Sequence, residues 1–267
     1  MSDPQILQVQ RDLKTLGFDP GPLDGVMGDK TRAALLLYTH GVGADAASVL
    51  SDPSRLHQEA QAKLSPVALP HAYLDLSDRC TNKEWRKKER PWSEITGVTL
   101  HQTGCPMGAL PERWLNLKAH FGITYEGGLY RIHPETAFGW HAQGLSHHTI
   151  GIEIAGCFEG IDGNPKTFPG LKGWAIQRIT QEQIEAAKEL IRYLKRLVAA
   201  HGGQLSGIYP HRIATDDRTA DPGERAWKEV ARPLMQELGL SDGGEGFTLG
   251  KGEPIPKEWD SRYKASY

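Results

Sequence analysis

The chain has 267 residues and a mass of 29.5 kDa, which is enough for one or two domains with buried cores. Its formal charge of −2 lacks the basic excess that is typical of dedicated nucleic-acid-binding proteins. No apolar run approaches the ~18 residues that a membrane span needs, and the first residues lack the pattern of a secretory signal. We therefore expect a protein made in the cytoplasm without a signal peptide, which neither binds nucleic acid nor inserts into a membrane.

The first 45 residues predict a small all-helical module. The apolar residues of its first helix have helical spacing: Ile6, Val9, Leu13 and Leu16. Gly17 ends this helix, residues 18–25 are dense in turn-forming Pro, Gly and Asp, and a second helix begins near Asp29. Short helices around a tight turn can fold together, so we place this module at residues 1–45.

Residues 46–93 are predicted to be a connecting region. Residues 44–64 have the composition of a helix, which Ser65-Pro66 and Leu69-Pro70 would break. Charged residues dominate positions 83–90, around a single Trp. We interpret this run as the solvated face of a helix, and the alternative is a patch that binds anionic polymers.

From about residue 94 the pattern becomes α/β. Four segments have the pattern of strands: residues 95–101, 121–125, 129–133 and 149–156. A Gly-Gly turn between the middle two predicts a hairpin. Thr180 and Gln183 form a capping box that begins a long amphipathic helix, and a last helix is predicted over residues 224–238. Residues 241–267 are predicted to be a C-terminal tail without a functional signal.

Two of the predicted strands carry polar side chains where a cleft could form. In the strand at 149–156, three isoleucines share one face, and Glu153 lies on the other face between Gly151 and Ala155. A carboxylate between two minimal side chains leaves room for a ligand, and the alternative is a salt-bridged edge residue. His101 ends its strand on the face turned away from the core, and the alternative there is a hydrogen-bonded structural histidine.

A polar loop supplies two more candidates. His211 and Asp221 lie ten residues apart among small and polar residues, and such loops can double back. Two imidazoles and one carboxylate form a suitable ligand set for catalytic zinc, because they leave a fourth position open for water. The metal would then acidify that water and polarise a carbonyl group. Spacing alone does not show that these side chains meet His101.

Four motifs occur in the same order as in a known enzyme family: Val98–Gly104, Trp140–Ala142, Thr149–Glu153, and His211 with Asp221–Gly223. Together they resemble the zinc-dependent N-acetylmuramoyl-L-alanine amidase type 2 family, which includes peptidoglycan recognition proteins and phage lysozyme-type amidases. The resemblance covers residues 94–240. It implies an α/β catalytic domain with a mixed central sheet flanked by helices, preceded by the small all-helical module.

The resemblance also implies a role for each motif. The implied Zn²⁺ ligands are His101, His211 and Asp221. Glu153 would be the general base that takes a proton from water. Trp140 and His141 resemble the segment that lines the substrate groove, where His141 would bind substrate or stabilise the oxyanion.

One position departs from the family pattern. Many members carry a Lys two residues before the ligand Asp, where it stabilises developing negative charge. In this chain Thr219 stands there, with Arg218 beside it. Either Thr219 donates a hydrogen bond, or Arg218 or His141 supplies the charge. We therefore count Thr219 as a catalytic candidate and Arg218 as a substrate-binding candidate.

The N-terminal module resembles the peptidoglycan-binding type 1 module. The matching residues are Leu13–Phe18, Pro20-Gly21, Asp24-Gly25, Gly28 and Thr31–Ala34. That family usually closes its last helix with an aromatic residue followed by Gln, whereas this chain has Tyr38-Thr39.

The two resemblances together imply a peptidoglycan hydrolase. It would cleave the amide bond between N-acetylmuramic acid and L-alanine of the stem peptide with zinc-activated water. We expect it to act in the periplasm or cell wall, either as a phage endolysin released through a holin or as an effector delivered by a specialised secretion machine. The alternatives are a non-catalytic peptidoglycan recognition protein and a cytoplasmic muropeptide-recycling amidase.

Overall fold

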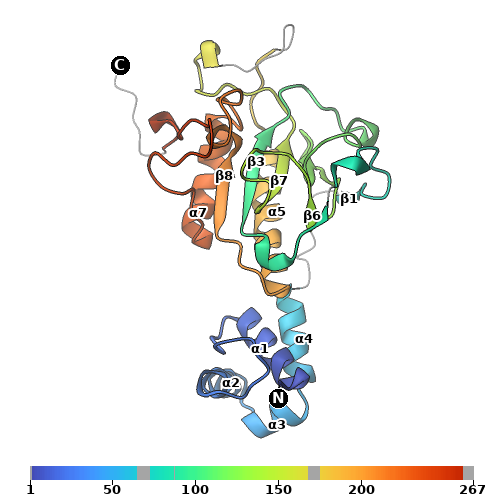
Figure 1. The fold of residues 1–267 in the computed structure, drawn as a ribbon, viewed down its shortest axis with the longest axis vertical. Coiled ribbons are helices and arrows are strands. Elements are labelled where there is room, and N and C mark those ends of the chain that lie inside the picture. The colour runs from blue at the N-terminus through green and yellow to red at the C-terminus, as the bar shows by residue number, and fades with distance from the viewer. Residues whose placement is uncertain (1, 65–72, 87, 168–174, 261–267) are drawn as a thin grey trace. The chain divides into compact units, whose positions relative to one another are not determined.

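The chain folds into two compact units, whose boundary lies between residues 64 and 73 (Figure 1). The computed structural model describes residues 2–64, 73–86, 88–167 and 175–260. The predicted helix-breaking prolines at positions 66 and 70 lie outside the described residues. Within the described residues, none of the helices combines the length and the apolar character required to cross a membrane.

The N-terminal unit consists of short helices around a small apolar core. The helices are α1 (Pro4–Leu16), α2 (Asp29–Val42), α3 (Ala46–Ser51) and α4 (Ser54–Leu64). The Asp3 carboxylate caps the start of α1, and Gly17 ends it in the left-handed conformation, as the sequence predicted. Val49 and Leu56 belong to the same buried cluster as Val9 and Leu13. Residues 46–64, which we expected to be connecting chain, are therefore part of this unit.

A buried amide holds the turn between α1 and α2. The Gln10 side chain is 1% exposed and accepts hydrogen bonds from the backbone N–H groups of Asp24 and Gly25. Its amide nitrogen donates to the Thr31 hydroxyl at 3.1 Å. Gly25 has φ +71°, and a Cβ there would lie 2.8 Å from the Asp3 carbonyl oxygen, so this turn requires glycine.

The second unit is built on a mixed sheet of six strands. In spatial order these are β1 (Tyr73–Asp75), β5 (Leu129–Arg131), β4 (Phe121–Ile123), β7 (Thr149–Ile154), β3 (Gly97–Gln102) and β8 (Gly207–Pro210). Neighbouring strands are parallel, except for the antiparallel hairpin of β4 and β5 that the sequence predicted. A separate antiparallel pair joins β2 (Lys88–Glu89) to β6 (Ala137–Phe138). The predicted α/β class with a mixed central sheet is confirmed.

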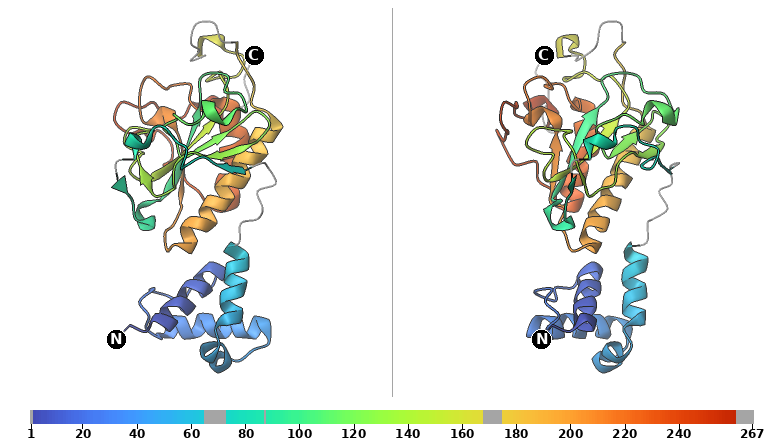
Figure 2. Two further views of the ribbon diagram at one scale, coloured as in Figure 1. Left: turned by 90° about the vertical axis from the view of Figure 1, so that its right-hand side faces the viewer. Right: turned by 45° about the vertical axis from the view of Figure 1, so that its right-hand side comes forward.

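Helices flank this sheet (Figures 1 and 2). The longest is α5 (Gln181–Ala200), which begins with the predicted capping box of Thr180 and Gln183. The predicted last helix consists of α6 (Glu224–Ala226), a π-helical segment (Trp227–Ala231) and α7 (Arg232–Leu238). The 3₁₀ turns are Lys83–Trp85, Trp92–Glu94, Pro111–Arg113, Pro165–Thr167, His211–Ile213 and Lys257–Trp259.

The two faces of the sheet carry different kinds of side chain. The three isoleucines of β7 are fully buried, as is most of the apolar stripe of α5, which lies along one face of the sheet (Figure 2). On the other face, strand glycines make room for rings. A Cβ on Gly122 would lie 2.2 Å from the Trp114 ring, and one on Gly151 would lie 2.8 Å from Nδ1 of His141. Alternation along the strands therefore separates an aliphatic layer from a layer of aromatic and polar rings.

The charged run at positions 83–90 is not the solvated helix that we expected. Its described residues form a 3₁₀ turn at Lys83–Trp85 and the short strand β2. Trp85 is 4% exposed and Arg90 is 2% exposed. The Arg90 guanidinium donates hydrogen bonds to backbone carbonyl oxygens of Ser146, Thr149 and Glu135. The predicted helix is therefore wrong. Lys83, Lys88 and Glu89 are exposed, but Arg90 satisfies buried carbonyl groups instead of facing water.

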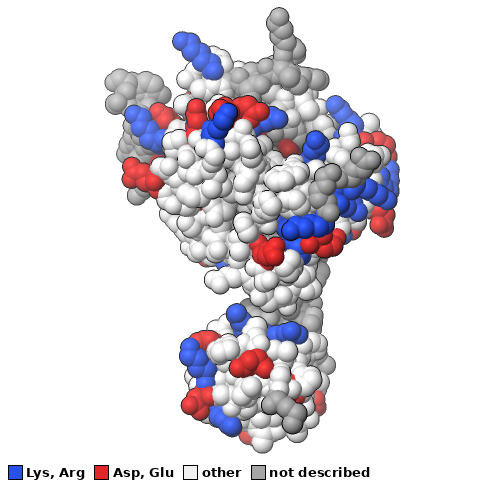
Figure 3. Space-filling model, viewed as in Figure 1, with Lys and Arg blue, Asp and Glu red and all other residues white. Residues whose placement is uncertain are grey.

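Charges of both signs lie side by side on the surface. On the face drawn in Figure 3, Lys and Arg side chains lie next to Asp and Glu side chains on each of the two units. The ion pairs Lys30–Asp19, Arg79–Glu112 and Arg192–Glu237 are examples.

Burial makes the stability of the second unit depend on pH through His133. This residue is fully buried, accepts a hydrogen bond from Nε of Arg86 at 2.9 Å, and lies 3.0 Å from the Leu117 carbonyl oxygen. Burial, with the charge of Arg86, lowers the pKa of His133 from 6.5 to about 4, although the Leu117 carbonyl opposes this shift. The unfolded chain therefore takes up this proton at a higher pH than the native protein.

We predict that this contribution to the free energy of unfolding is complete above pH ~6.5 and falls by about 3 kcal/mol as the pH drops to ~4. His133→Gln should show a shallower fall than the wild type, measured by urea denaturation of the metal-free protein across this range. The matched control is His148→Gln, because His148 is exposed in the same unit. Equal slopes for His133→Gln and the wild type would contradict the prediction.

Candidate active site

Three parallel strands bring the predicted site residues to one edge of the sheet. His101 lies next to the last residue of β3 and is directly paired with Glu153 of β7. β3 also pairs in parallel with β8, and His211 is the first residue after β8. Because parallel strands end at the same edge, these side chains come from segments far apart in the sequence and meet in space.

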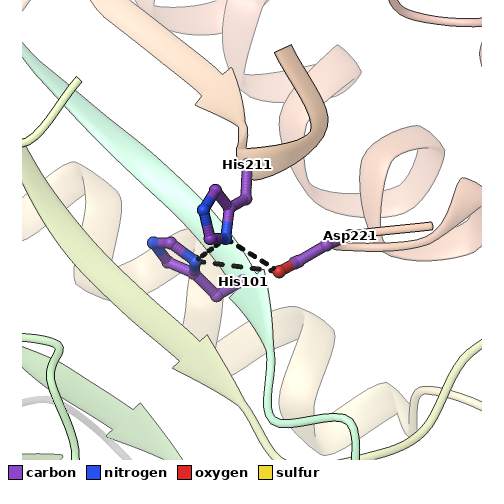
Figure 4. Close-up of side chains that lie close together, drawn as sticks. All are labelled: His101, His211 and Asp221. Atoms are coloured by element: carbon purple, nitrogen blue, oxygen red, sulfur yellow. Dashed lines mark hydrogen bonds and ion pairs between the residues drawn. The ribbon is translucent and has the colours of Figure 1, made fainter. Parts of the chain in front are cut away.

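His101, His211 and Asp221 point toward one another (Figure 4). Each residue offers one metal-ligand atom, and these three atoms lie within 4.8 Å of one another. All three residues are buried. The Nδ1 atoms of the histidines are 2.9 Å apart, and Oδ2 of Asp221 lies 3.1 Å from Nδ1 of His211 and 3.8 Å from Nδ1 of His101. The structure therefore brings together the three residues that the sequence proposed as metal ligands.

The chain around Asp221 fixes the direction of its carboxylate. Oδ1 accepts a hydrogen bond from the backbone N–H of Gln102 at 2.8 Å, which leaves Oδ2 directed at the histidines. The Gln102 side chain donates to the Ala220 carbonyl oxygen at 2.8 Å and accepts from the Phe158 N–H at 2.6 Å. Gln102 thus ties β3 to the loop that carries Asp221. We did not single out this glutamine as a functional residue, although it follows His101 directly in the sequence.

Protonation within this cluster suits a cation. Burial and the neighbouring His211 lower the pKa of His101 from 6.5 to about 4. Burial alone would raise the pKa of Asp221, but the hydrogen bonds and charges of the two histidines outweigh it and lower this pKa to about 2. A neutral imidazole and an ionised carboxylate are the forms that bind metals. Two nitrogen atoms and one oxygen atom in these forms are a ligand set that fits Zn²⁺.

Glu153 has the environment of a general base. The residue is half-buried, and its Oε2 atom is enclosed without a hydrogen-bond partner among the described residues. Burial and the negative charge of Asp221 raise the pKa of Glu153 from 4.5 to about 8, and the charge of Arg218 partly opposes this shift. Enclosed, unpartnered carboxylate oxygens are rare in folded proteins and are common at functional sites.

A pocket of about 380 Å³ opens at the cluster and is lined by Trp140, His141, His211 and Arg218, among others. Trp140 is 53% exposed, and its ring contacts those of Phe138 and His147 at centroid distances of 5.2 and 5.4 Å. The predicted substrate-binding residues are thus brought together at one opening beside the candidate metal ligands.

Thr219 does not line this pocket. It is half-buried, and its carbonyl oxygen accepts a hydrogen bond from the guanidinium of Arg212. Arg218, in contrast, is exposed and lies on the pocket wall. Of the two residues at the position where many relatives carry Lys, Arg218 is the one that faces the opening.

Arg212 is a residue that the sequence analysis missed. Its backbone N–H donates to the Asp221 carbonyl oxygen at 3.1 Å, so it links the residue after His211 to Asp221 itself. Its guanidinium also donates to the Pro254 carbonyl oxygen at 3.0 Å and to Glu253 at 3.2 Å, and lies over the Trp259 ring. The only sequence signal was its position directly after His211.

Part of the segment 241–267, which we expected to be a tail without a functional signal, supports the site. Leu249 donates a backbone hydrogen bond to the Ile213 carbonyl oxygen, and Phe247 and Ile255 pack against the cluster that contains Ile213. Trp259 is fully buried, and its indole N–H donates to the Gly160 carbonyl oxygen. Residues 247–259 thus pack behind the loop that carries His211.

Comparisons with known families assign the chain. The model of the family described as N-acetylmuramoyl-L-alanine amidase matches residues 91–224, and that of the "Putative peptidoglycan binding domain" matches residues 2–38. The chain therefore belongs to the N-acetylmuramoyl-L-alanine amidase family, which includes both enzymes and peptidoglycan-binding relatives. No curated protein is significantly similar to it in sequence.

Solved structures with a similar fold include bacterial, phage and animal proteins. The endolysin N-acetylmuramoyl-L-alanine amidase LysCS from Clostridium intestinale is 18% identical, with a TM-score of 0.42 over 63% of this chain and 96% of that one. The Ph2119 endolysin from a Thermus scotoductus bacteriophage is 18% identical (TM-score 0.40; 63% and 99% covered). Drosophila peptidoglycan recognition protein SD is 15% identical (TM-score 0.44; 64% and 97% covered). The family assignment rests on the sequence match, not on these likenesses.

We predict that Arg212→Met weakens Zn²⁺ binding by roughly 10- to 100-fold, because groups that orient metal ligands typically contribute that much. It should also lower thermal stability, since carbonyl groups that Arg212 satisfies would lose their donor. Zn²⁺ affinity is measured by competition with a chelator. Arg192→Met, which removes a surface ion pair with Glu237, is the control and should leave the affinity unchanged. An unchanged affinity in Arg212→Met would refute this role.

Proposed function

We propose that the protein is a zinc-dependent amidase that cleaves the bond between N-acetylmuramic acid and L-alanine in peptidoglycan. The observation that carries this proposal is the convergence of His101, His211 and Asp221 beside the enclosed carboxylate of Glu153. The family match supports this class of bond, and the geometry supports this means of breaking it. In this class, bound Zn²⁺ polarises the amide carbonyl and increases the acidity of water.

Glu153 moves the protons of the reaction. Its carboxylate takes a proton from the attacking water, whose oxygen forms the new bond to the amide carbon. The same carboxyl group then gives that proton to the nitrogen of L-alanine as the C–N bond breaks. Burial raises the pKa of Glu153, which helps its carboxyl group to hold the proton between these two transfers.

The pocket wall would position the substrate. Trp140 offers an exposed ring, held by Phe138 and His147, against which an apolar face of the muropeptide can pack. Arg218 offers a positive charge to the carboxylates of the peptide or to the oxyanion of the transition state. We assign the stabilising role of the usual family Lys to Arg218 and not to Thr219.

A module of the peptidoglycan-binding class favours the assembled wall as the substrate over small soluble fragments. Attachment through residues 2–38 would raise the local concentration of wall polymer for the second unit. A non-catalytic recognition protein is the competing function, and the unpartnered Oε2 of Glu153 beside three intact ligand positions favours the enzyme.

Purified sacculi distinguish the two functions. We predict that the protein releases stem peptides with new L-alanine amino termini and without new reducing sugar ends, and that a chelator stops the release. Glu153→Gln should keep Zn²⁺ but lose turnover by about 10³-fold or more, because it removes the proton carrier. Glu229→Gln, an exposed change in the same unit, is the control. Binding to sacculi without any release would establish the recognition protein, and full activity of Glu153→Gln would remove this residue from the mechanism.

Three further variants test the position that departs from the family pattern. We predict that Arg218→Gln lowers kcat by roughly 10- to 100-fold and that Arg218→Lys recovers much of the loss, since a cation is what the site requires. Thr219→Val should change kcat by less than about 3-fold, because the contact of Thr219 to Arg212 uses its backbone carbonyl. The opposite ranking would show that the hydroxyl of Thr219 takes the role.

A further inference from the structure

We propose that His141 is a positioning residue that sets the ring hydrogen of His101. In this arrangement His141 holds the hydrogen of His101 on Nε2, so that Nδ1 of His101 keeps a free electron pair toward His211 and Asp221. The inference rests on the proposed metal site, and it gives His141 a different role from the substrate contact that the sequence suggested. It follows from the direction of each hydrogen bond in a short buried chain.

The series of hydrogen bonds begins at Thr149. Nε2 of His141 lies 3.3 Å from the Thr149 carbonyl oxygen and 3.5 Å from its hydroxyl oxygen. That hydroxyl donates its single hydrogen to the Leu145 carbonyl oxygen at 2.9 Å and accepts one from the Thr99 hydroxyl at 2.8 Å. Both oxygens beside Nε2 can therefore only accept, and Nε2 of His141 must carry the ring hydrogen.

The hydrogen on Nε2 of His141 determines the direction of its hydrogen bond with His101. His141 is buried, and its ring nitrogen atoms contact only His101 and Thr149 among the described residues. Because no carboxylate lies within hydrogen-bond distance to balance a second ring hydrogen there, the ring carries one hydrogen. A neutral ring with its hydrogen on Nε2 can only accept at Nδ1. Nδ1 of His141 lies 3.1 Å from Nε2 of His101, so His101 donates from Nε2.

Without His141, the ring hydrogen of His101 could lie on Nδ1 instead of Nε2. The Asp221 carboxylate lies 3.8 Å from Nδ1 of His101 and would attract a hydrogen to that atom. A hydrogen on Nδ1 would occupy the electron pair that a metal needs. His141 therefore keeps the ligand in its metal-binding form before any metal arrives.

The surroundings of His141 are built to hold its ring. The residue is 9% exposed, and the His120 ring packs against it edge-on at a centroid distance of 5.5 Å. Gly151 lies beneath it, where a Cβ would come within 2.8 Å of Nδ1 and 2.9 Å of Cγ of His141. A strand residue with any side chain at this position would displace the ring. With both nitrogen atoms engaged, His141 has no free donor for an oxyanion.

Nitrogen NMR of the metal-free protein tests the inference directly. In protein with ¹⁵N-labelled histidines, we expect His101 to carry its hydrogen on Nε2. His141→Leu should shift His101 toward the form with hydrogen on Nδ1 and weaken Zn²⁺ binding by roughly 10- to 100-fold. His141→Asn retains an acceptor oxygen and should recover part of both effects. His148→Leu, an exposed change in the same segment, should alter neither.

The wild-type spectrum alone can overturn the proposal. A hydrogen on Nδ1 of His101 would do so, as would a folded His141→Leu variant with unchanged ring signals. Should His141→Leu fail to fold, Gly151→Ala displaces the same ring and should produce the same shift. The two proposals fail separately: a wild-type protein that binds no Zn²⁺ contradicts the proposed function, whereas normal Zn²⁺ binding with the hydrogen on Nδ1 contradicts only the role of His141.

Discussion

The register of three parallel strands is the constraint on which the candidate site depends. β3 pairs with β7 so that His101 lies beside Glu153, and β8 ends where His211 begins. Because side chains alternate along a strand, a slip of one residue would turn these groups into the aliphatic layer. The buried isoleucines of β7 oppose such a slip, since they would have to face the polar side. Apolar packing on one face thus specifies the polar geometry on the other.

The site combines this apolar support with groups that are costly to bury. The enclosed Oε2 of Glu153 has no partner among the described residues, and several neighbouring histidines are neutral in the folded protein. Unpartnered buried polar atoms destabilise a fold, so their presence is easier to understand as a requirement of chemistry than of stability. The rest of the unit compensates with groups such as Arg90, whose Nη1 and Nη2 atoms donate to three buried backbone carbonyl oxygens.

Much of this arrangement could be predicted from the sequence. Alternation gave the face of Glu153, and the capping box and glycine stops gave the main helices, because these signals are local. The ligand set required the resemblance to a family, since no local pattern shows that His101 and Asp221 meet across 120 positions. Arg90, Gln102 and Arg212 were missed for a related reason. These side chains matter because they contact backbone groups of distant segments, and such contacts produce no periodic pattern in the sequence.

The position of Trp259 bears on where the amidase-family domain of this chain ends. The family match ends at residue 224, yet the polypeptide that closes around Arg212 continues for some 35 residues beyond it. A fragment that ends where the family match ends would lose the Trp259 indole and the Glu253 carboxylate, which contact Arg212. Recombination that exchanges domains of this chain would therefore preserve the loop with the candidate metal ligands only if the exchanged fragment includes residues 247–259. The segment that must be inherited together is longer than the segment that the family match recognises.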